Sequence, residues 1–455
     1  MSAFRKAVFP RGIQVRGTRA HRPRLPIRSL VATALAGLLA TAGCSSPSPE
    51  NQGSGGPSAT SPAASESSAG AGSAAQCPPL SATVPTDNPA GGTFTASDPD
   101  SSALTRADGG TSAVANATVT KSGASSNVDS SSFDGLNAAV LVSNGSRLSL
   151  NNATVNTSGT GANAVFSTGT GSLIELANTT VNTDGSFAHA VEATAGGAVT
   201  GSDLTLTTAR DHSSTIATDR GGGEITINRA TATAAGDLSA AVYSTGDISL
   251  CGVIGTSRAA EGAVVEGANT LISTGSELTG ATHGAYLYSS TPGGSGGGSL
   301  TVSGGSLTGQ NGNAVLIEGV PGTVAISDGA KLSAGSEALI AATSGGAGTV
   351  NVAETELDGN LTADPDSSLV VSLTSNSTVS GALSNVGISL DTTSRVLLQA
   401  DSTATTVEGA LIAGREISNI TGNGHTLTYD PSAAENAYLD GGTYTLGQGG
   451  SLAPQ

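Results

Sequence analysis

Nine short apolar segments recur along this chain and constrain its fold more than any other feature. The distance from one start to the next averages 25 residues, and the segments are NAAVLVS from Asn137, NAVFST from Asn163, HAVEAT from His189, STIATD from Ser214, SAAVYS from Ser239, EGAVVE from Glu261, HGAYLY from His283, NAVLIE from Asn313 and EALIAA from Glu337. Between them lie segments of period two, such as RLSLNNATVNT and EITINRATAT, bounded by Gly, Asn, Asp and Ser. Three strands in 25 residues without a helix signal are typical of one coil of a right-handed parallel β-helix.

The composition agrees with a narrow solenoid core. Aromatic residues make up 3% of the chain and charged residues 12%, so burial must come from Val, Ile, Leu and Ala stacked in series. We therefore predict an all-β solenoid of about 13 coils, spaced by about 4.8 Å. The predicted organisation is a signal peptide (1–43), a tether (44–80), an N-terminal cap region (81–111), β-helix repeats (112–385), and C-terminal coils with a cap (386–455).

The N-terminus predicts export and a lipid anchor. Residues 1–43 hold eight Lys and Arg and no acidic residue, and the apolar run from Leu30 ends at Cys44. This run is too short to span about 30 Å of hydrocarbon, but it fits a signal peptide. Ala42-Gly43-Cys44 resembles the lipobox of bacterial lipoproteins, in which the cysteine is acylated and anchors the protein to the outside of the cell membrane. Thr41 departs from the usual Leu, and an ordinary secretory cleavage is the alternative.

The segment after Cys44 is almost pure Ser, Pro, Gly and Ala, which predicts a disordered tether because little apolar area is available for burial.

The chain after residue 43 is strongly acidic. It contains 10 of the 18 Lys and Arg against 35 Asp and Glu, which gives it a net charge of −25. Nucleic acid is excluded as a partner, since neutralising phosphates requires a basic surface. No cofactor motif is present, and no Cys/His cluster with zinc spacing.

The two remaining cysteines, Cys77 and Cys251, admit two interpretations. In an exported protein they could pair and join the start of the folded region to its middle. Each could instead be a small buried apolar residue.

Several distinctive motifs lie between residues 90 and 454, and they are GLNAAV (135–140), GANAVFSTG (161–169), ATDRGGG (217–223), YSTGDI (243–248) and the ending NGHTLTYDPSAAENAYLDGGTYTLGQGGSLAP. In these motifs the chain resembles a widespread family of bacterial secreted β-strand-repeat proteins. More loosely, the repeats are similar to autotransporter passenger domains. The resemblance implies the fold and an exported location, and it implies no reaction.

The stretch TIATDRGGGEITI brings Asp219, Arg220 and Glu224 together in a chain poor in charge. One interpretation is a staple between coils, with Gly221 to Gly223 forming a tight corner. The other is a polar face that binds a saccharide or performs chemistry. Aligning the repeats places Arg220 within reach of Glu192 one coil away, with Glu266 and Tyr288 further along. The same alignment predicts one column of Glu192, Ala217, Tyr243, Val265 and Leu287, with Asp219 beside Thr194 and Thr245.

A second predicted column contains turn residues. Asn137, Asn163 and Asn313 precede the same strand in different coils, as expected if asparagine supports a turn with positive φ. His189 and His283 share that column, and we expect them to face solvent rather than bind metal.

The sequence favours a non-catalytic adhesive or envelope-associated protein that binds a surface glycan or a protein. The alternative is an enzyme similar to pectate lyases and related polysaccharide-cleaving β-helix proteins, for which Asp211, Asp219, Arg220 and Glu224 supply the residue types. Sugar clefts usually have aromatic platforms, and here Trp is absent and the six Tyr are scattered along the sequence. No catalytic residue and no metal ligand is therefore assigned.

Overall fold

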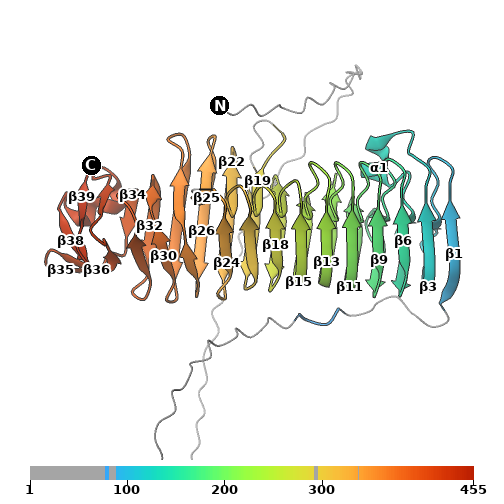
Figure 1. The fold of residues 1–455 in the computed structure, drawn as a ribbon, viewed down its shortest axis with the longest axis horizontal. Coiled ribbons are helices and arrows are strands. Elements are labelled where there is room, and N and C mark those ends of the chain that lie inside the picture. Colours follow the sequence, from blue (N-terminus) through green and yellow to red (C-terminus); the bar gives the residue numbers. More distant parts are fainter. Residues whose placement is uncertain (1–76, 81–88, 292–295, 337) are drawn as a thin grey trace, which may run out of the picture. The chain divides into compact units, whose positions relative to one another are not determined.

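The structure is a computed structural model that describes residues 77–80, 89–291, 296–336 and 338–455. It is a parallel β-solenoid of about 14 turns, which confirms the predicted all-β parallel β-helix. Its coils stack one upon the next along a single axis (Figure 1). Within the described residues, helix is confined to α1 (Val128–Asp134) and the 3₁₀ helix η1 (Ala434–Leu439). Cys44 and the predicted signal peptide and most of the tether lie outside the described residues.

The smaller sheet has twelve parallel strands, one from each successive coil. The nine apolar repeats of the sequence form nine consecutive strands of it, from β4 to β25. In order, the sheet contains β2 (Leu104–Arg106), β4 (Val140–Val142), β7 (Val165–Thr168), β10 (Val191–Thr194), β12 (Ile216–Asp219), β14 (Val242–Ser244), β16 (Ala263–Glu266), β19 (Ala285–Tyr288), β22 (Val315–Glu318), β25 (Ala338–Thr343), β28 (Asn360–Ala363) and β31 (Leu383–Ser384).

The larger sheet has 27 strands and supplies the rest of each coil. Its strands are β1 (Ala90–Ala96), β3 (Thr111–Lys121), β5 (Arg147–Asn151), β6 (Thr154–Thr157), β8 (Leu173–Ala177), β9 (Thr180–Thr183), β11 (Ala198–Thr208), β13 (Glu224–Ala234), β15 (Asp247–Ser257), β17 (Thr270–Thr274), β18 (Glu277–Gly280), β20 (Gly298–Ser303), β21 (Ser306–Gly309), β23 (Pro321–Ser327), β24 (Lys331–Ala334), β26 (Ala347–Ala353), β27 (Glu356–Asp358), β29 (Ser368–Thr374), β30 (Thr378–Gly381), β32 (Val386–Leu390), β33 (Arg395–Leu398), β34 (Ser402–Glu408), β35 (Ile412–Ala413), β36 (Glu416–Thr421), β37 (Thr426–Tyr429), β38 (Tyr444–Gly447) and β39 (Ser451–Pro454).

The core consists of columns of apolar side chains, one from each coil. The register of the smaller sheet gives one such column, which runs from Leu104 through Val140, Val165, Val191, Ile216, Val242, Ala263, Ala285, Val315, Ile340 and Leu361 to Leu383. All of these but Leu104 are buried. Because side chains alternate along a strand, the residue that follows this column on each strand points away from the core. Those outward residues make the face on which the candidate site lies.

The larger sheet bends at residues with positive φ, and this corrects the prediction for the asparagines. The bend lies at equivalent positions of successive coils, occupied by Asn116, Asn152, Asn178, Asp203, Arg229 and Gly252 with φ between 48° and 63°. The predicted column of Asn137, Asn163 and Asn313 has no positive φ. These side chains are buried and donate hydrogen bonds to carbonyl oxygens instead, as Asn137 does to Gly123 at 2.8 Å and Asn163 to Ser131 at 3.0 Å.

The C-terminal end departs from the parallel pattern. The smaller sheet ends at β31, whereas the larger sheet continues. Here β35 pairs with β36, and β38 with β39, in antiparallel fashion. The fully buried Tyr429 donates a hydrogen bond to the Gly442 carbonyl at 2.9 Å.

Cys77 and Cys251 form a disulfide with a Cα–Cα distance of 5.5 Å. Cys251 lies on β15, in the middle of the solenoid, and is 6% exposed. The carbonyl of Pro78, which follows Cys77 in the chain, accepts a hydrogen bond from the Asn228 amide at 2.5 Å. The segment that precedes the first coil is thus fastened to β13 and β15 on the larger sheet.

Candidate functional site

The charged stretch of the sequence forms the corner between β12 and β13. The Asp219 carboxylate accepts a hydrogen bond from the Arg220 backbone N–H at 2.6 Å. Gly221 and Gly222 have φ of 83° and 69°, a conformation that favours glycine. At Gly223 a Cβ would lie 2.5 Å from the Ala193 carbonyl oxygen, so only glycine fits against the preceding coil. The backbone of this corner therefore requires all three glycines, as the interpretation of a staple between coils with a tight corner predicts.

The predicted reach of Arg220 toward Glu192 is wrong. The Arg220 guanidinium lies over the ring of Phe133, 3.6 Å from its centroid, in a cation–π contact. Phe133 belongs to α1, which comes from an earlier coil. The two oxygens of Glu192 have no hydrogen-bond partner among the described residues.

The column predicted to contain Glu192, Ala217, Tyr243, Val265 and Leu287 is also partly wrong. Glu192 is in register with Ala217, and Ala217 with Tyr243, as expected, but the next members are Val264 and Tyr286. Val265 and Leu287 point into the core and are fully buried. Thr194 does pair with Asp219, and Glu266 with Tyr288.

Two of the acidic candidates lie elsewhere. Glu224 begins β13 on the larger sheet, where its cross-coil partners are Ala198 and Asp247. Asp211 precedes β12 and accepts hydrogen bonds from Ser186 and the His212 ring. The set proposed for a lyase is thus divided between different faces and corners.

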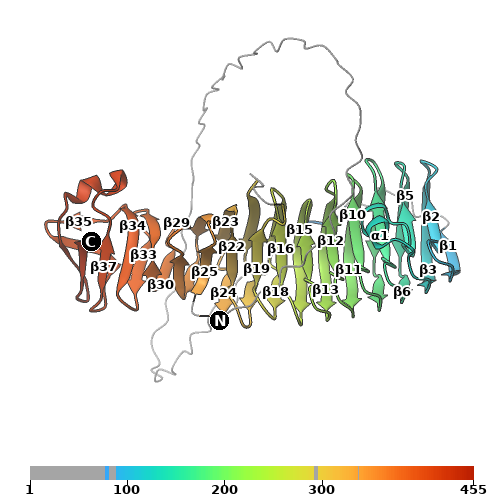
Figure 2. The same ribbon diagram turned by 90° about the horizontal axis from the view of Figure 1, so that it is seen from above.

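Helix α1 covers the outward face of β7 and β10. The Thr194 hydroxyl donates a hydrogen bond to the Phe133 carbonyl at 3.0 Å. A Cβ at Gly135, which ends the helix, would lie 2.6 Å from the Phe166 ring. Phe166, Glu192 and Thr194 are outward residues, yet none has any exposed area. We call these three residues the covered region; Figure 2 shows α1 beside the coils at this end of the solenoid.

Burial dominates the electrostatics of the covered region. It raises the pKa of Glu192 well above its ordinary range, and the Asp219 carboxylate adds to the shift. Burial also raises the pKa of Asp219 to about 6, against the lowering effect of the hydrogen bond from the Arg220 N–H. A buried carboxyl group without a hydrogen-bond partner costs about 1–3 kcal/mol. Glu192 is therefore a stabilising residue in neither protonation state.

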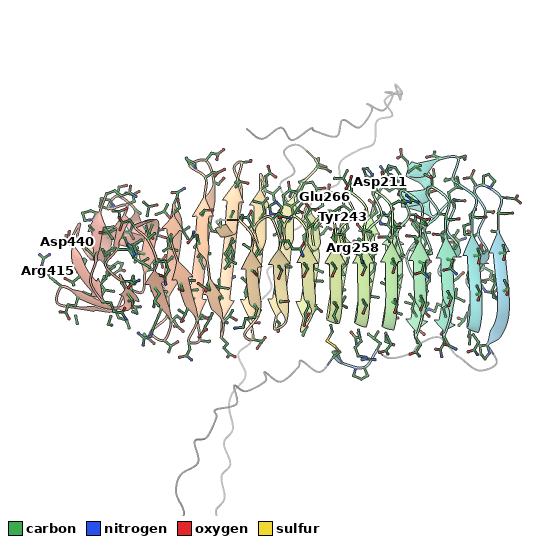
Figure 3. All side chains as sticks on the ribbon, viewed as in Figure 1. Asp211, Tyr243, Arg258, Glu266, Arg415 and Asp440 are labelled. Atoms are coloured by element: carbon green, nitrogen blue, oxygen red, sulfur yellow. A yellow bond between two sulfur atoms is a disulfide. The ribbon has the colours of Figure 1, made fainter. Side chains whose placement is uncertain are left out.

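The next coils carry partly exposed aromatic residues on the same face. Tyr243 and Tyr288 both donate their hydroxyl hydrogens to the Glu266 carboxylate, the second at 3.0 Å. The other Glu266 oxygen accepts from the Ser290 backbone N–H at 3.2 Å and from its hydroxyl. Figure 3 shows Tyr243 and Glu266 side by side near the middle of the solenoid. Every oxygen of this carboxylate is thus bonded, in contrast to Glu192.

A second carboxylate holds the third tyrosine. Tyr286 donates to Glu318, whose other oxygen accepts from the Ser344 hydroxyl at 3.3 Å. The rings of Tyr286 and Tyr288 stack with centroids 4.6 Å apart and planes 3° apart. Burial is the main cause that raises the pKa of each of these phenols, so they remain protonated donors. Tyr243, Tyr286, Tyr288, Glu266 and Glu318 are called the tyrosine patch below.

Sequence reasoning missed four members of this site: Phe133, Phe166, Tyr286 and Glu318. The signal for Tyr286 was present, since AYLY in β19 alternates and places both tyrosines on one face. The Glu318 signal was its position at the end of the next repeat, directly after Ile317, the cross-coil partner of Leu287. Phe133 lies in an insertion that no other repeat contains, so alignment of the repeats could not place it.

The two histidines do not face solvent as predicted. Both are half-buried. The His189 ring lies 3.2 Å from the Ser214 carbonyl, and burial lowers the pKa of this histidine to about 4. His283 accepts a hydrogen bond from the Asn313 backbone N–H at 3.0 Å. Their ring nitrogens are used in hydrogen bonds between coils.

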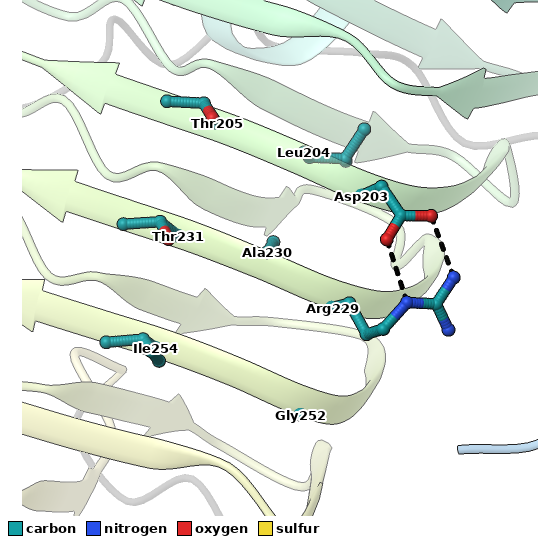
Figure 4. A pocket seen from close by; sticks show the side chains of 8 residues that line it. All are labelled: Asp203, Leu204, Thr205, Arg229, Ala230, Thr231, Gly252 and Ile254. Atoms are coloured by element: carbon teal, nitrogen blue, oxygen red, sulfur yellow. Dashed lines mark hydrogen bonds and ion pairs between the residues drawn. The ribbon is translucent and has the colours of Figure 1, made fainter. Parts of the chain in front are cut away.

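A shallow hollow of about 290 Å³ lies on the larger sheet, away from this face (Figure 4). Its prominent feature is a bidentate ion pair in which Arg229 donates to Asp203 at 2.8 and 2.7 Å across neighbouring coils. Both side chains are about half exposed, and such pairs contribute little, about 0–1 kcal/mol. The hollow is explained by the bend of the sheet.

In the described part of the chain, no group of three or more His, Cys, Asp or Glu side chains is arranged to hold a metal ion. Nor does any helix of these residues have the length and apolar character needed to cross a membrane. A search of family models and a search of curated proteins both return no match to the chain.

Proposed function

We propose that the protein is a non-catalytic adhesive protein of the cell surface that binds a surface glycan through the tyrosine patch. One observation carries the proposal: half of the six tyrosines of the chain gather, partly exposed, on one face of three coils. Tyrosine combines apolar ring area with a hydroxyl group, which suits sugar rings and their hydroxyls. The scattered tyrosines of the sequence therefore supply the aromatic surface that sugar binding needs.

The arrangement is rigid before any ligand binds. Glu266 fixes two of the rings and Glu318 fixes the third through hydrogen bonds. Side chains that are already fixed lose little conformational entropy on binding, which favours affinity. The acidic surface favours a neutral glycan over a polyanionic one.

Export and lipid anchoring through Cys44 complete the proposal. Their support is the basic head, the short apolar run and the Ala-Gly-Cys ending of the sequence. Cys44→Ala should prevent labelling by a fatty-acid analogue and release the protein from the membrane fraction. Equal labelling of both proteins would contradict the anchor.

Glycan-array binding tests the adhesive function. Tyr286→Ala with Tyr288→Ala should weaken binding at least about tenfold, because stacking and hydroxyl contacts are lost together. Tyr438→Ala is the matched control: this tyrosine is 45% exposed and belongs to η1, remote from the patch in the coil order. Equal loss in both variants, or none in either, would contradict the proposal.

Cleavage of the bound glycan is the second candidate function. The raised pKa values of Glu192 and Asp219 favour it, since a protonated carboxyl group is what a general acid requires. An incubation of neutral polysaccharides with the wild-type protein and with Asp219→Asn, followed by measurement of new reducing ends, separates this candidate from simple binding.

A further inference from the structure

Helix α1 lies in an insertion that occurs in one coil only. Eighteen residues separate β3 from β4, whereas seven separate β6 from β7 and seven separate β9 from β10. The extra residues reach across the following coils, where Phe133 contacts Thr194 and Arg220. The insertion thus serves as a cover over the strands that follow it in the stack.

Both polar and apolar contacts hold α1 itself on the coils beneath it. The Thr194 hydroxyl donates to the Phe133 carbonyl and the Asn163 amide to the Ser131 carbonyl. The Arg220 guanidinium lies over the Phe133 ring, and Gly135 packs closely against the Phe166 ring. The Ser131 hydroxyl faces inward, fully buried, and has no hydrogen-bond partner among the described residues. A cover that leaves polar groups unsatisfied on both sides is poorly matched to what it covers.

The group beneath the cover points to a ligand. The Glu192 carboxyl is fully buried, and neither of its oxygens has a hydrogen-bond partner. It occupies the same outward column as Tyr243 and Tyr286. Removal of α1 would therefore extend the tyrosine patch along the solenoid by the covered region.

We propose that α1 covers a saccharide subsite, in which the Glu192 carboxyl group binds sugar hydroxyls and the Phe166 ring provides an apolar surface. The inference rests on the proposed function, because it lengthens the same binding face. A ligand that fills the subsite must displace α1, so the free energy of opening is subtracted from its affinity.

The charges around the subsite define the ligand class. Asp219 on β12 is acidic and lies beside Thr194, while Arg220 is engaged with Phe133. An anionic sugar would meet Asp219 and Glu192, whereas neutral hydroxyls can donate to a carboxylate or accept from a carboxylic acid. The subsite therefore suits a neutral oligosaccharide.

Cysteine labelling tests the cover without any ligand. In the full chain with Cys44→Ser, Glu192→Cys and Ala193→Cys place a thiol at adjacent fully buried positions, one outward beneath α1 and one in the core. A maleimide should label Glu192→Cys at least about tenfold faster, because only α1 must open. Adding Phe133→Ala should accelerate the labelling of Glu192→Cys and leave the labelling rate of Ala193→Cys unchanged. Equal rates at the two positions would overturn the proposal.

Binding of chitohexaose, mannan, laminarin and dextran tests the subsite itself. Phe133→Ala should tighten binding of the saccharide that the wild-type protein binds, and adding Glu192→Ala should cancel the gain. Unchanged or weaker binding by Phe133→Ala would overturn the subsite while the proposed function stands. Binding by Phe133→Ala alone, dependent on Glu192, would support the subsite and contradict the function assigned to the exposed tyrosine patch.

Discussion

The covered region and the tyrosine patch lie on one face of one sheet. Each contains a carboxyl group, but the two groups differ in hydrogen bonding and in burial. Glu266 accepts four hydrogen bonds, from two tyrosines and from Ser290, and remains partly exposed. Glu192 accepts none and is fully buried. The strands beneath them pair in the same continuous register, so the backbone does not cause the difference.

The comparison shows that the surroundings of an outward residue on a solenoid are set by insertions, because the coils themselves are equivalent. Where α1 reaches over the sheet, a carboxyl group loses water and gains no partner. Beyond the reach of α1, two tyrosines and Ser290, which follows β19, supply the donors to Glu266. One face can therefore hold a rigid exposed surface and a concealed one.

The largest expected effect comes from making the patch resemble the covered region. Tyr243→Phe with Tyr288→Phe removes two donors from Glu266 and should lower the free energy of unfolding by about 1–3 kcal/mol at neutral pH. Urea denaturation measures the change. Tyr438→Phe, which removes one hydrogen bond to the Val407 carbonyl, is the control and should cost less. Equal stability of the double variant and the wild type would show that Glu266 does not depend on its tyrosines.

The next effect comes from removing the concealed charge. Because burial raises the folded-state pKa of Glu192, its carboxyl group destabilises the fold least below the ordinary pKa of 4.5, and the destabilisation grows as the pH rises from there to the folded-state value. Glu192→Gln should therefore gain stability relative to wild type between pH 5 and pH 8, on the order of 1 kcal/mol. Urea midpoints at both pH values measure it. A difference that stays constant with pH would refute the assigned burial.

The smallest effect concerns the attachment of the cover. Arg220→Ala removes the cation–π contact with Phe133 and should cost about 0.5–1 kcal/mol. Hydrogen exchange of residues 128–134 should accelerate while that of the core strands does not change. Arg258→Ala, at an exposed arginine that follows β15, is the matched control. If α1 exchanges at the same rate in both variants, Arg220 does not hold the cover.

The fold could be predicted because every coil repeats the same physical constraint. A buried column needs one small or branched apolar residue every 25 or so positions, and nine repeats make that signal hard to mistake. The alternation within each segment then identifies strands.

The candidate site was predicted only in part, since side-chain direction depends on register to a single residue. The prediction assigned Val265 and Leu287, which point into the core, to the outward positions that Val264 and Tyr286 occupy. This shift by one residue left Tyr286 out of the predicted site. The contact between Arg220 and Phe133 joins residues 87 positions apart through an insertion that occurs once. Nothing periodic in the sequence encodes such a contact.

The Cys77–Cys251 disulfide also determines how the molecule bears a mechanical load. A pull on the chain before Cys77 enters the solenoid at β15, which directly follows β14 with Tyr243 in the same coil. If the tyrosine patch binds a ligand as proposed, a tension between that chain and the ligand crosses one or two coils instead of travelling along the stack. The hydrogen bonds between coils are loaded together in that short section, and the disulfide directs the load away from the terminal coils, where peeling would begin.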